Sequence, residues 1–78
     1  MKKNNYISKT AFDKIKINDV YFIRFMLGTA VVLCLPYSKE AIIDGNTETQ
    51  EYIDVRMIGG PWDGKKLSVI RQQLKKSS

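Results

Sequence analysis

The clearest alternation of apolar and polar residues lies in the last third of the chain. From Glu51 onward, every second residue is apolar, which is typical of a strand with one buried face. Residues 65–70 alternate again, with Leu67 and Val69 on the apolar side. We therefore expect a β-hairpin of strands 51–58 and 65–70. In the first strand, one face carries Ile53, Val55 and Met57, and the other carries Tyr52, Asp54, Arg56 and Ile58.

Residues 20–35 form the most apolar stretch of the sequence. They are rich in β-branched and aromatic residues, which favours two core strands, 20–27 and 29–35, joined at Gly28-Thr29. A single membrane span is the alternative. If the stretch were inserted in a membrane, the lysines that precede it would keep the N-terminal segment in the cytoplasm. However, the stretch is shorter than the ~20 residues of a span and contains Arg24. A signal peptide is excluded by the long segment before it.

The remaining segments give weaker patterns. Ser8 or Thr10 could cap a short helix through Lys16, although residues 12–17 also alternate as a strand would, and the pattern leaves both structures open. Residues 38–43 fit one helical turn or a short edge strand, and Asp44-Gly45-Asn46 predicts a turn. Ile70 and Leu74 are four residues apart, a spacing that allows a short terminal helix.

These patterns predict a small α+β or mostly β fold, with an antiparallel sheet of about four strands that ends in a C-terminal β-hairpin. At 78 residues the chain holds one domain at most. We expect a flexible basic N-terminus over residues 1–10, a single small domain over 11–70, and a basic C-terminal tail over 71–78. So small a core makes association with a partner, or with itself, a natural source of stability.

The connection between the last two strands, residues 59–64, is compositionally unusual. It holds three of the five glycines, the only Trp and one of the two prolines. Trp62-Asp63 followed by Gly64 fits a type I turn closed by a residue at positive φ, and Pro61 stiffens the loop. Trp62 is expected either to cover the sheet as a hydrophobic lid or to stand out as a contact. In the second case Trp62, Lys65 and Lys66 form a candidate binding surface for a protein or a stacked base.

Catalytic and metal-binding chemistry lack the residues they need. Gly59 to Lys65 matches the first seven positions of a phosphate-binding P-loop, but Lys66 stands where the hydroxyl of Ser or Thr is required and a strand follows instead of a helix. The sequence has no His and a single Cys, so it lacks the base of a catalytic triad and the set of Cys and His ligands of a zinc site. We predict a protein that is not an enzyme and that uses no metal or cofactor. Cys34, flanked by leucines, is expected to be a buried apolar residue, and one cysteine favours a reducing, cytoplasmic location.

The net charge of +5 is unevenly distributed, because both ends of the sequence are basic and the centre is acidic. If the ends converge in space, they form a positive face. Nucleic acid is therefore one candidate partner, bound without sequence preference and in a salt-dependent manner. No helix-turn-helix, zinc-finger or RNA-binding signature accompanies the charge.

The segment from Val55 to Lys65 resembles the Gly-Gly-Pro-x-Asp-Gly turn of small uncharacterised bacteriophage and prophage proteins. This resemblance covers about a seventh of the chain and specifies a turn. It implies an accessory protein of a mobile element that acts on a host protein. The leading hypothesis is accordingly a small binding protein with a protein partner, with sequence-independent nucleic-acid binding and a single-span membrane protein as alternatives.

Overall fold

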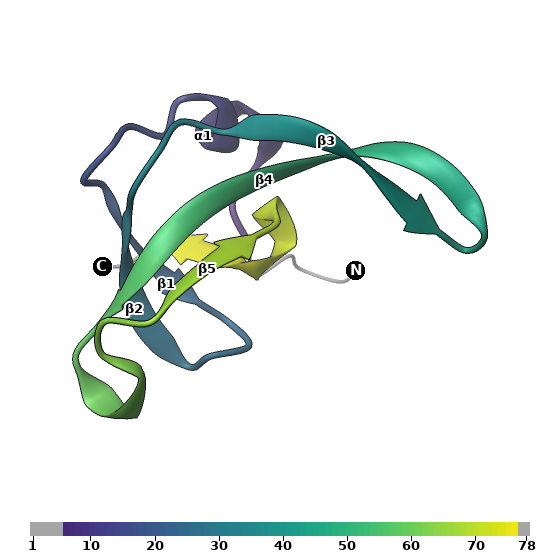
Figure 1. Cartoon of the computed structure of the whole chain (residues 1–78). Coiled ribbons are helices and arrows are strands. Elements are labelled where there is room, and N and C mark those ends of the chain that lie inside the picture. Colours follow the sequence, from purple (N-terminus) through teal and green to yellow (C-terminus); the bar gives the residue numbers. More distant parts are fainter. Residues whose placement is uncertain (1–5, 77–78) are drawn as a thin grey trace, which may run out of the picture.

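A computed structural model describes residues 6–76, and antiparallel strands dominate it (Figure 1). The predicted fold class, a small mostly β domain that includes a C-terminal hairpin, is confirmed, with six strands instead of about four. Along the chain the elements are α1 (Lys9–Asp13), β1 (Val20–Ile23), β2 (Gly28–Val32), β3 (Tyr37–Ile43), β4 (Asn46–Ile58), η1 (Gly60–Trp62), β5 (Lys66–Val69), η2 (Arg71–Gln73) and β6 (Leu74–Lys76).

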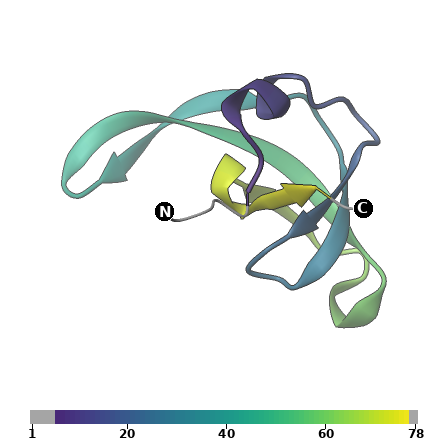
Figure 2. The ribbon, with the colours of Figure 1, turned by 180° about the vertical axis from the view of Figure 1, so that it is seen from behind.

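Strand β4 organises the sheet. Its first half pairs only with β3, from Tyr37 opposite Tyr52 to Ile43 opposite Asn46. Its second half pairs with β2 and with β5, and the sheet continues through β1 to β6. Figures 1 and 2 show the consequence: the sheet curls around the core, whereas the β3–β4 ribbon extends away from it. We call residues 37–52 the arm and the remaining described residues the body.

The core lies inside the curl and is built from the inward side chains of the strands and of the N-terminal segment. Met57, Val55 and Ile53 of β4 are buried, as their alternation predicts, and Val69 of β5 is buried opposite Ile53. Burial of these side chains supplies most of the stabilisation of so small a domain. The complete buried set is Ile7, Phe12, Ile15, Ile23, Ala30, Val32, Ile53, Val55, Met57, Val69 and Leu74.

The N-terminal segment forms a helix that is shorter than expected. Ser8 caps α1 by accepting a hydrogen bond from the backbone N–H of Ala11 (3.1 Å). The helix ends at Asp13 instead of Lys16, and Phe12 and Ile15 then enter the core together. This short helix closes over the curl of the sheet (Figure 1).

The connection between β1 and β2 differs from the prediction, because the turn lies at residues 24–27 and Gly28 is part of β2. A Cβ at Gly28 would lie 3.0 Å from the Met57 side chain. The glycine therefore makes room for the packing of a core methionine and does not form the turn.

The structure decides between the two alternatives for residues 38–43 and differs from the prediction for the C-terminal segment. Residues 38–43 belong to β3, so the strand alternative holds and the helical turn is wrong. Residues 71–76 form η2 and β6 in place of a terminal helix, and Leu74 is buried against the core. The folded unit thus extends beyond residue 70 and includes residues 7–13, while residues 1–5 and 77–78 lie outside the described part.

The apolar stretch 20–35 contains β1, the turn at residues 24–27 and β2. Within residues 6–76, no helix has the length and apolar character needed to cross a membrane.

Candidate binding surface

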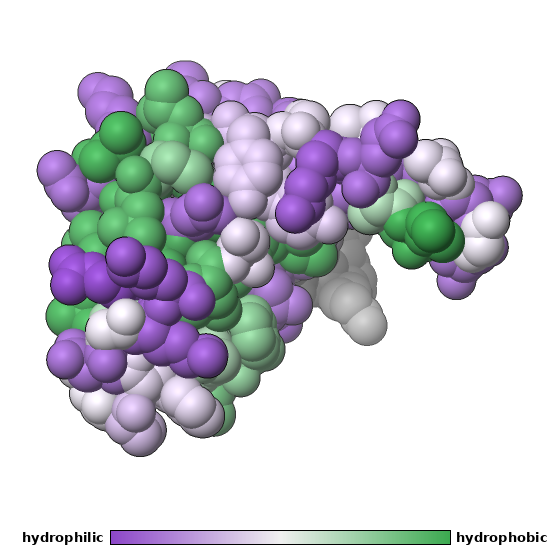
Figure 3. All heavy atoms as spheres, in the orientation of Figure 1, coloured by the Kyte–Doolittle hydropathy of each residue, from purple (hydrophilic) through white to green (hydrophobic). Residues whose placement is uncertain are grey.

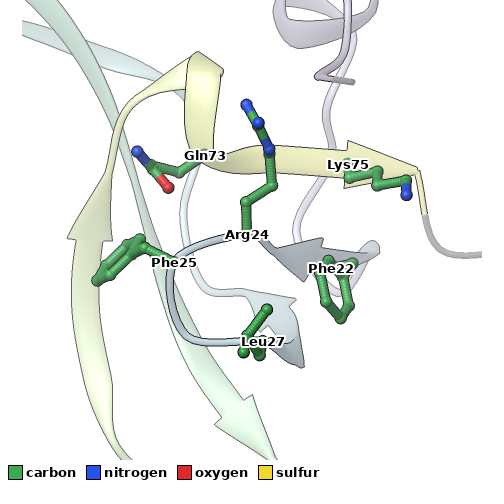
Figure 4. Close-up of a pocket in the computed structure, with 6 residues that line it drawn as sticks. All are labelled: Phe22, Arg24, Phe25, Leu27, Gln73 and Lys75. Carbon is green, nitrogen blue, oxygen red and sulfur yellow. The ribbon is translucent and has the colours of Figure 1, made fainter. Parts of the chain in front are cut away.

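A groove of about 450 Å³ lies where the β1–β2 turn meets β6 (Figure 4). Phe22 and Phe25 lie on opposite sides of Leu27. Lys75 of β6 is paired with Phe22 of β1. None of the described residues that line the groove carries a carboxylate. The lining consists of Phe22, Arg24, Phe25, Leu27, Gln73 and Lys75.

The turn that carries this groove holds large apolar side chains in water. Phe25 is 57% exposed and Leu27 is 81% exposed. Leu27 also has φ of 51°, a left-handed conformation that is unfavourable for a branched side chain. Phe25 and Leu27 thus form an exposed apolar pair in this turn.

Backbone and side-chain hydrogen bonds fix the turn to the C-terminal segment. The N–H of Arg24 donates to Gln73 O (2.8 Å), and its guanidinium donates to Gln72 O (3.0 Å). Arg71 donates to Ile7 O (3.0 Å). The two guanidinium carbons lie 5.9 and 5.2 Å from the centroid of the Tyr6 ring, within the range of cation–π attraction. The aromatic ring and the carbonyl oxygens orient both arginines while leaving their charge intact.

The cations beside the groove are not neutralised by acids. Lys9 takes part in both of the ion pairs found among residues 6–76, with Asp13 (2.9 Å) and Glu51 (2.7 Å). Arg24, Arg71 and Lys75 therefore have no carboxylate partner within that part of the chain. Their positive charge is available to an external anion.

The groove continues onto the outer face of the sheet. Phe22 lies directly opposite Lys75 on one side and Thr29 on the other, and Thr29 lies opposite Ile58. Two residues before Phe22 in β1, a second row on the same face starts at Val20. It continues through Val31 and Arg56 and ends at Lys66. The outer face thus has an apolar middle with cations at both margins.

Trp62, Lys65 and Lys66, the residues singled out from the sequence, lie at the β4–β5 end of the molecule. Trp62 is 46% exposed, which favours the contact expectation over the lid. Lys66 joins the outer face through its pairing with Arg56, whereas Trp62 belongs to the loop beyond Ile58. None of the three lines the groove. The groove could not be predicted from the sequence, because Phe22 and Phe25 occur in an apolar run that is typical of core strands.

The loop that carries Trp62 is rigid, but its turn is not of type I. Asp63 has φ −50° and ψ 128° and Gly64 has φ 87°, the values of a type II turn. A 3₁₀ turn, η1, precedes it. The Asp63 carboxylate accepts a hydrogen bond from Gly59 N (2.6 Å), and Gly64 N donates to Met57 O (2.9 Å). The loop therefore presents Trp62 in a fixed position.

Charge is segregated between the arm and the body. The arm carries Glu40, Asp44, Glu48 and Glu51 against Lys39, a net charge of −3. The body has ten cations and four acids among its described residues, a net charge of +6. The acidic centre of the sequence is thus the arm that projects from a basic body. The cations are Lys9, Lys14, Lys16, Arg24, Arg56, Lys65, Lys66, Arg71, Lys75 and Lys76, and the acids are Asp13, Asp19, Asp54 and Asp63.

A polar cluster joins three strands where the arm leaves the body. Tyr37 Oη (2.7 Å) and Ser68 Oγ (2.6 Å) both donate to Asp54 Oδ1. These hydrogen bonds, that from Ser68 first and that from Tyr37 second, lower the pKa of the Asp54 carboxyl. Cys34 is half-buried instead of fully buried. The cluster connects β3 and β5 through β4, which is a structural role.

Among the described residues, no group of three or more Cys, Asp or Glu side chains could hold a metal ion. Comparisons of the chain with models of known protein families, with curated proteins and with solved structures found no match.

Proposed function

We propose that the protein is a non-enzymatic binding protein that holds single-stranded nucleic acid, without sequence preference, in the groove between Phe22 and Phe25. The observation that carries this proposal is the combination of an exposed ring, Phe25, and a half-buried ring, Phe22, with cations in a groove whose described lining has no carboxylate. Aromatic rings offer a stacking platform to any base, and the cations attract the phosphates.

The outer face supports the same function. A strand whose bases contact Phe22 and Phe25 has its phosphates near Lys75, and the face continues toward Arg56 and Lys66. Single-stranded nucleic acid suits this surface better than a duplex, because exposed aromatic side chains stack on bases only where the bases are unpaired. The basic body adds a long-range attraction for a polyanion.

The proposal is tested by fluorescence anisotropy with a fluorescein-labelled oligothymidylate at low salt. We expect saturable binding that Phe25→Ala weakens by about tenfold, since stacking contributes roughly 1–3 kcal/mol per base. Leu35→Ala is the matched control, because Leu35 is an exposed apolar residue that does not line the groove. Absence of binding, or equal binding by wild type and Phe25→Ala, would refute the proposal.

A protein partner is the second candidate function, and Trp62 is the observation that favours it. A half-exposed Trp on a rigid loop, beside Lys65 and Lys66, has the character of an interface hot spot. The resemblance to bacteriophage and prophage proteins points to a host protein as that partner. Nucleic acid ranks first because the groove unites aromatic and cationic groups, whereas Trp62 stands outside it.

A further inference from the structure

We propose that two copies of this chain associate by placing the tip of the acidic arm of one copy in the basic groove of the other. The inference goes beyond nucleic-acid binding and does not depend on it. It starts from the arm, which is a two-stranded ribbon that extends away from the core (Figures 1 and 2). A ribbon of two strands is marginally stable in water, and a partner surface would stabilise it.

The arm carries an apolar side chain between two carboxylates. Ile42 is 78% exposed, although it is a large aliphatic residue on a strand. Glu40 precedes it on the same face of β3, and Asp44 follows it in the turn. The space-filling view shows one hydrophobic spot surrounded by hydrophilic residues near the end of the arm (Figure 3). An isolated apolar residue at the tip of a projecting element is suited to insertion into a pocket.

The groove has the complementary arrangement. Its apolar part is formed by Phe22, Phe25 and Leu27, and Arg24 and Lys75 line the side next to β6. Insertion of Ile42 would bury its side chain against the phenylalanine rings while its acidic neighbours approach the two cations. Charge on both sides then favours the contact, with a net −3 on the arm and +6 on the body. A second copy is therefore a better occupant of this site than an uncharged protein.

When two copies exchange arms reciprocally, the arm of each lies in the groove of the other, and the assembly is a closed dimer with two-fold symmetry. Each copy then contributes one arm and one groove, and both apolar surfaces are covered. The arm and single-stranded nucleic acid would compete for Phe22 and Phe25. Oligothymidylate is therefore expected to dissociate the assembly.

The test is sedimentation velocity of the full chain without nucleic acid, over a range of concentrations at low salt. We expect wild type to form a dimer at high micromolar concentration and Ile42→Asp to raise the apparent dissociation constant at least about tenfold. Leu35→Asp is the matched control, since it introduces the same charge at an exposed apolar position outside the arm and the groove. The proposal is overturned if wild type stays monomeric, or if Ile42→Asp and Leu35→Asp behave alike.

Charge reversal provides an independent test that does not rely on a destabilised variant. Glu40→Lys with Glu48→Lys makes the arm basic, and Lys75→Glu with Lys76→Glu makes the β6 margin of the groove acidic; all four positions are exposed. The first pair of changes raises the arm from −3 to +1, so that it repels the basic body, and the second pair lowers the body from +6 to +2. Each double variant alone should therefore associate more weakly than wild type. A mixture of the two should form a heterodimer. Failure of the mixture to associate would contradict the proposal, whatever the result of the anisotropy experiment.

Discussion

At the scale of single residues, Asp54 illustrates how one carboxylate can connect three strands. It accepts hydrogen bonds from Tyr37 of β3 and Ser68 of β5, and both reach the same oxygen. A hydrogen bond to a charged acceptor contributes more than a neutral one. We therefore expect the junction of arm and body to depend on the ionisation of this side chain.

This dependence gives a pH prediction with a defined sign. Because the folded state lowers the pKa of Asp54, its contribution to stability is fully present above the unfolded pKa of about 4 and is lost as the pH falls through the lower, folded value. Wild type should therefore lose free energy of unfolding below about pH 4. In Asp54→Asn the acidic loss should be smaller, as measured by urea denaturation from pH 7 to pH 2.5. An unchanged pH profile in the variant would show that Asp54 is not the responsible group.

Residue-level reasoning from the sequence succeeded where a side chain has one dominant role. The alternation of Ile53, Val55 and Met57 identified buried residues correctly, because a half-buried strand imposes a period of two. It failed at Gly28, where the glycine accommodates a methionine that is 29 positions away in the chain. It also failed for Phe25, because a run of apolar residues does not reveal which of them face water.

At the scale of elements, the β4–β5 hairpin and the position of its loop were predictable, whereas the type of its turn and the arm were not. The hairpin combines clear alternation with the turn residues of Gly59 to Gly64. The N-terminal half of β4, residues 46–50, is polar on both faces because neither face is buried. It therefore shows no period, and its pattern alone does not distinguish a loop from the start of the next strand. The groove was missed for a similar reason, since it forms only where β6 pairs with β1.

The loop allows a prediction about Trp62. Because this side chain is half-exposed and the loop is held by Asp63 and Gly64, Trp62→Ala should change the free energy of unfolding by less than about 1 kcal/mol. Amide dispersion in an NMR spectrum should stay intact. If the second candidate function holds, the same variant loses its protein partner. Collapse of the dispersion would mean that Trp62 is required for folding and would rule out a pure contact role.

At the scale of the whole molecule, charge is separated between the acidic arm and the basic body. A uniformly basic chain would bind polyanions through any surface. Here the acidic residues concentrate in the arm, and the cations of the groove lie on the body with no carboxylate partner among the described residues. The basic C-terminal segment contributes Arg71, Lys75 and Lys76 to the cations of the body. Segregation of this kind directs an anionic ligand to one face.

The salt dependence of oligothymidylate binding tests the central claim most directly. For single strands, the slope of log K against log salt is about −0.7 for each phosphate contact. Lys75→Gln should make the slope less negative by about 0.7, whereas Phe25→Ala should lower the affinity at every salt concentration and leave the slope unchanged. Such a difference between the two variants would assign the phosphate contact to Lys75 and the base contact to Phe25. Slopes that are identical in wild type and Lys75→Gln, or an affinity unaffected by Phe25→Ala, would contradict the claim that the groove holds single-stranded nucleic acid.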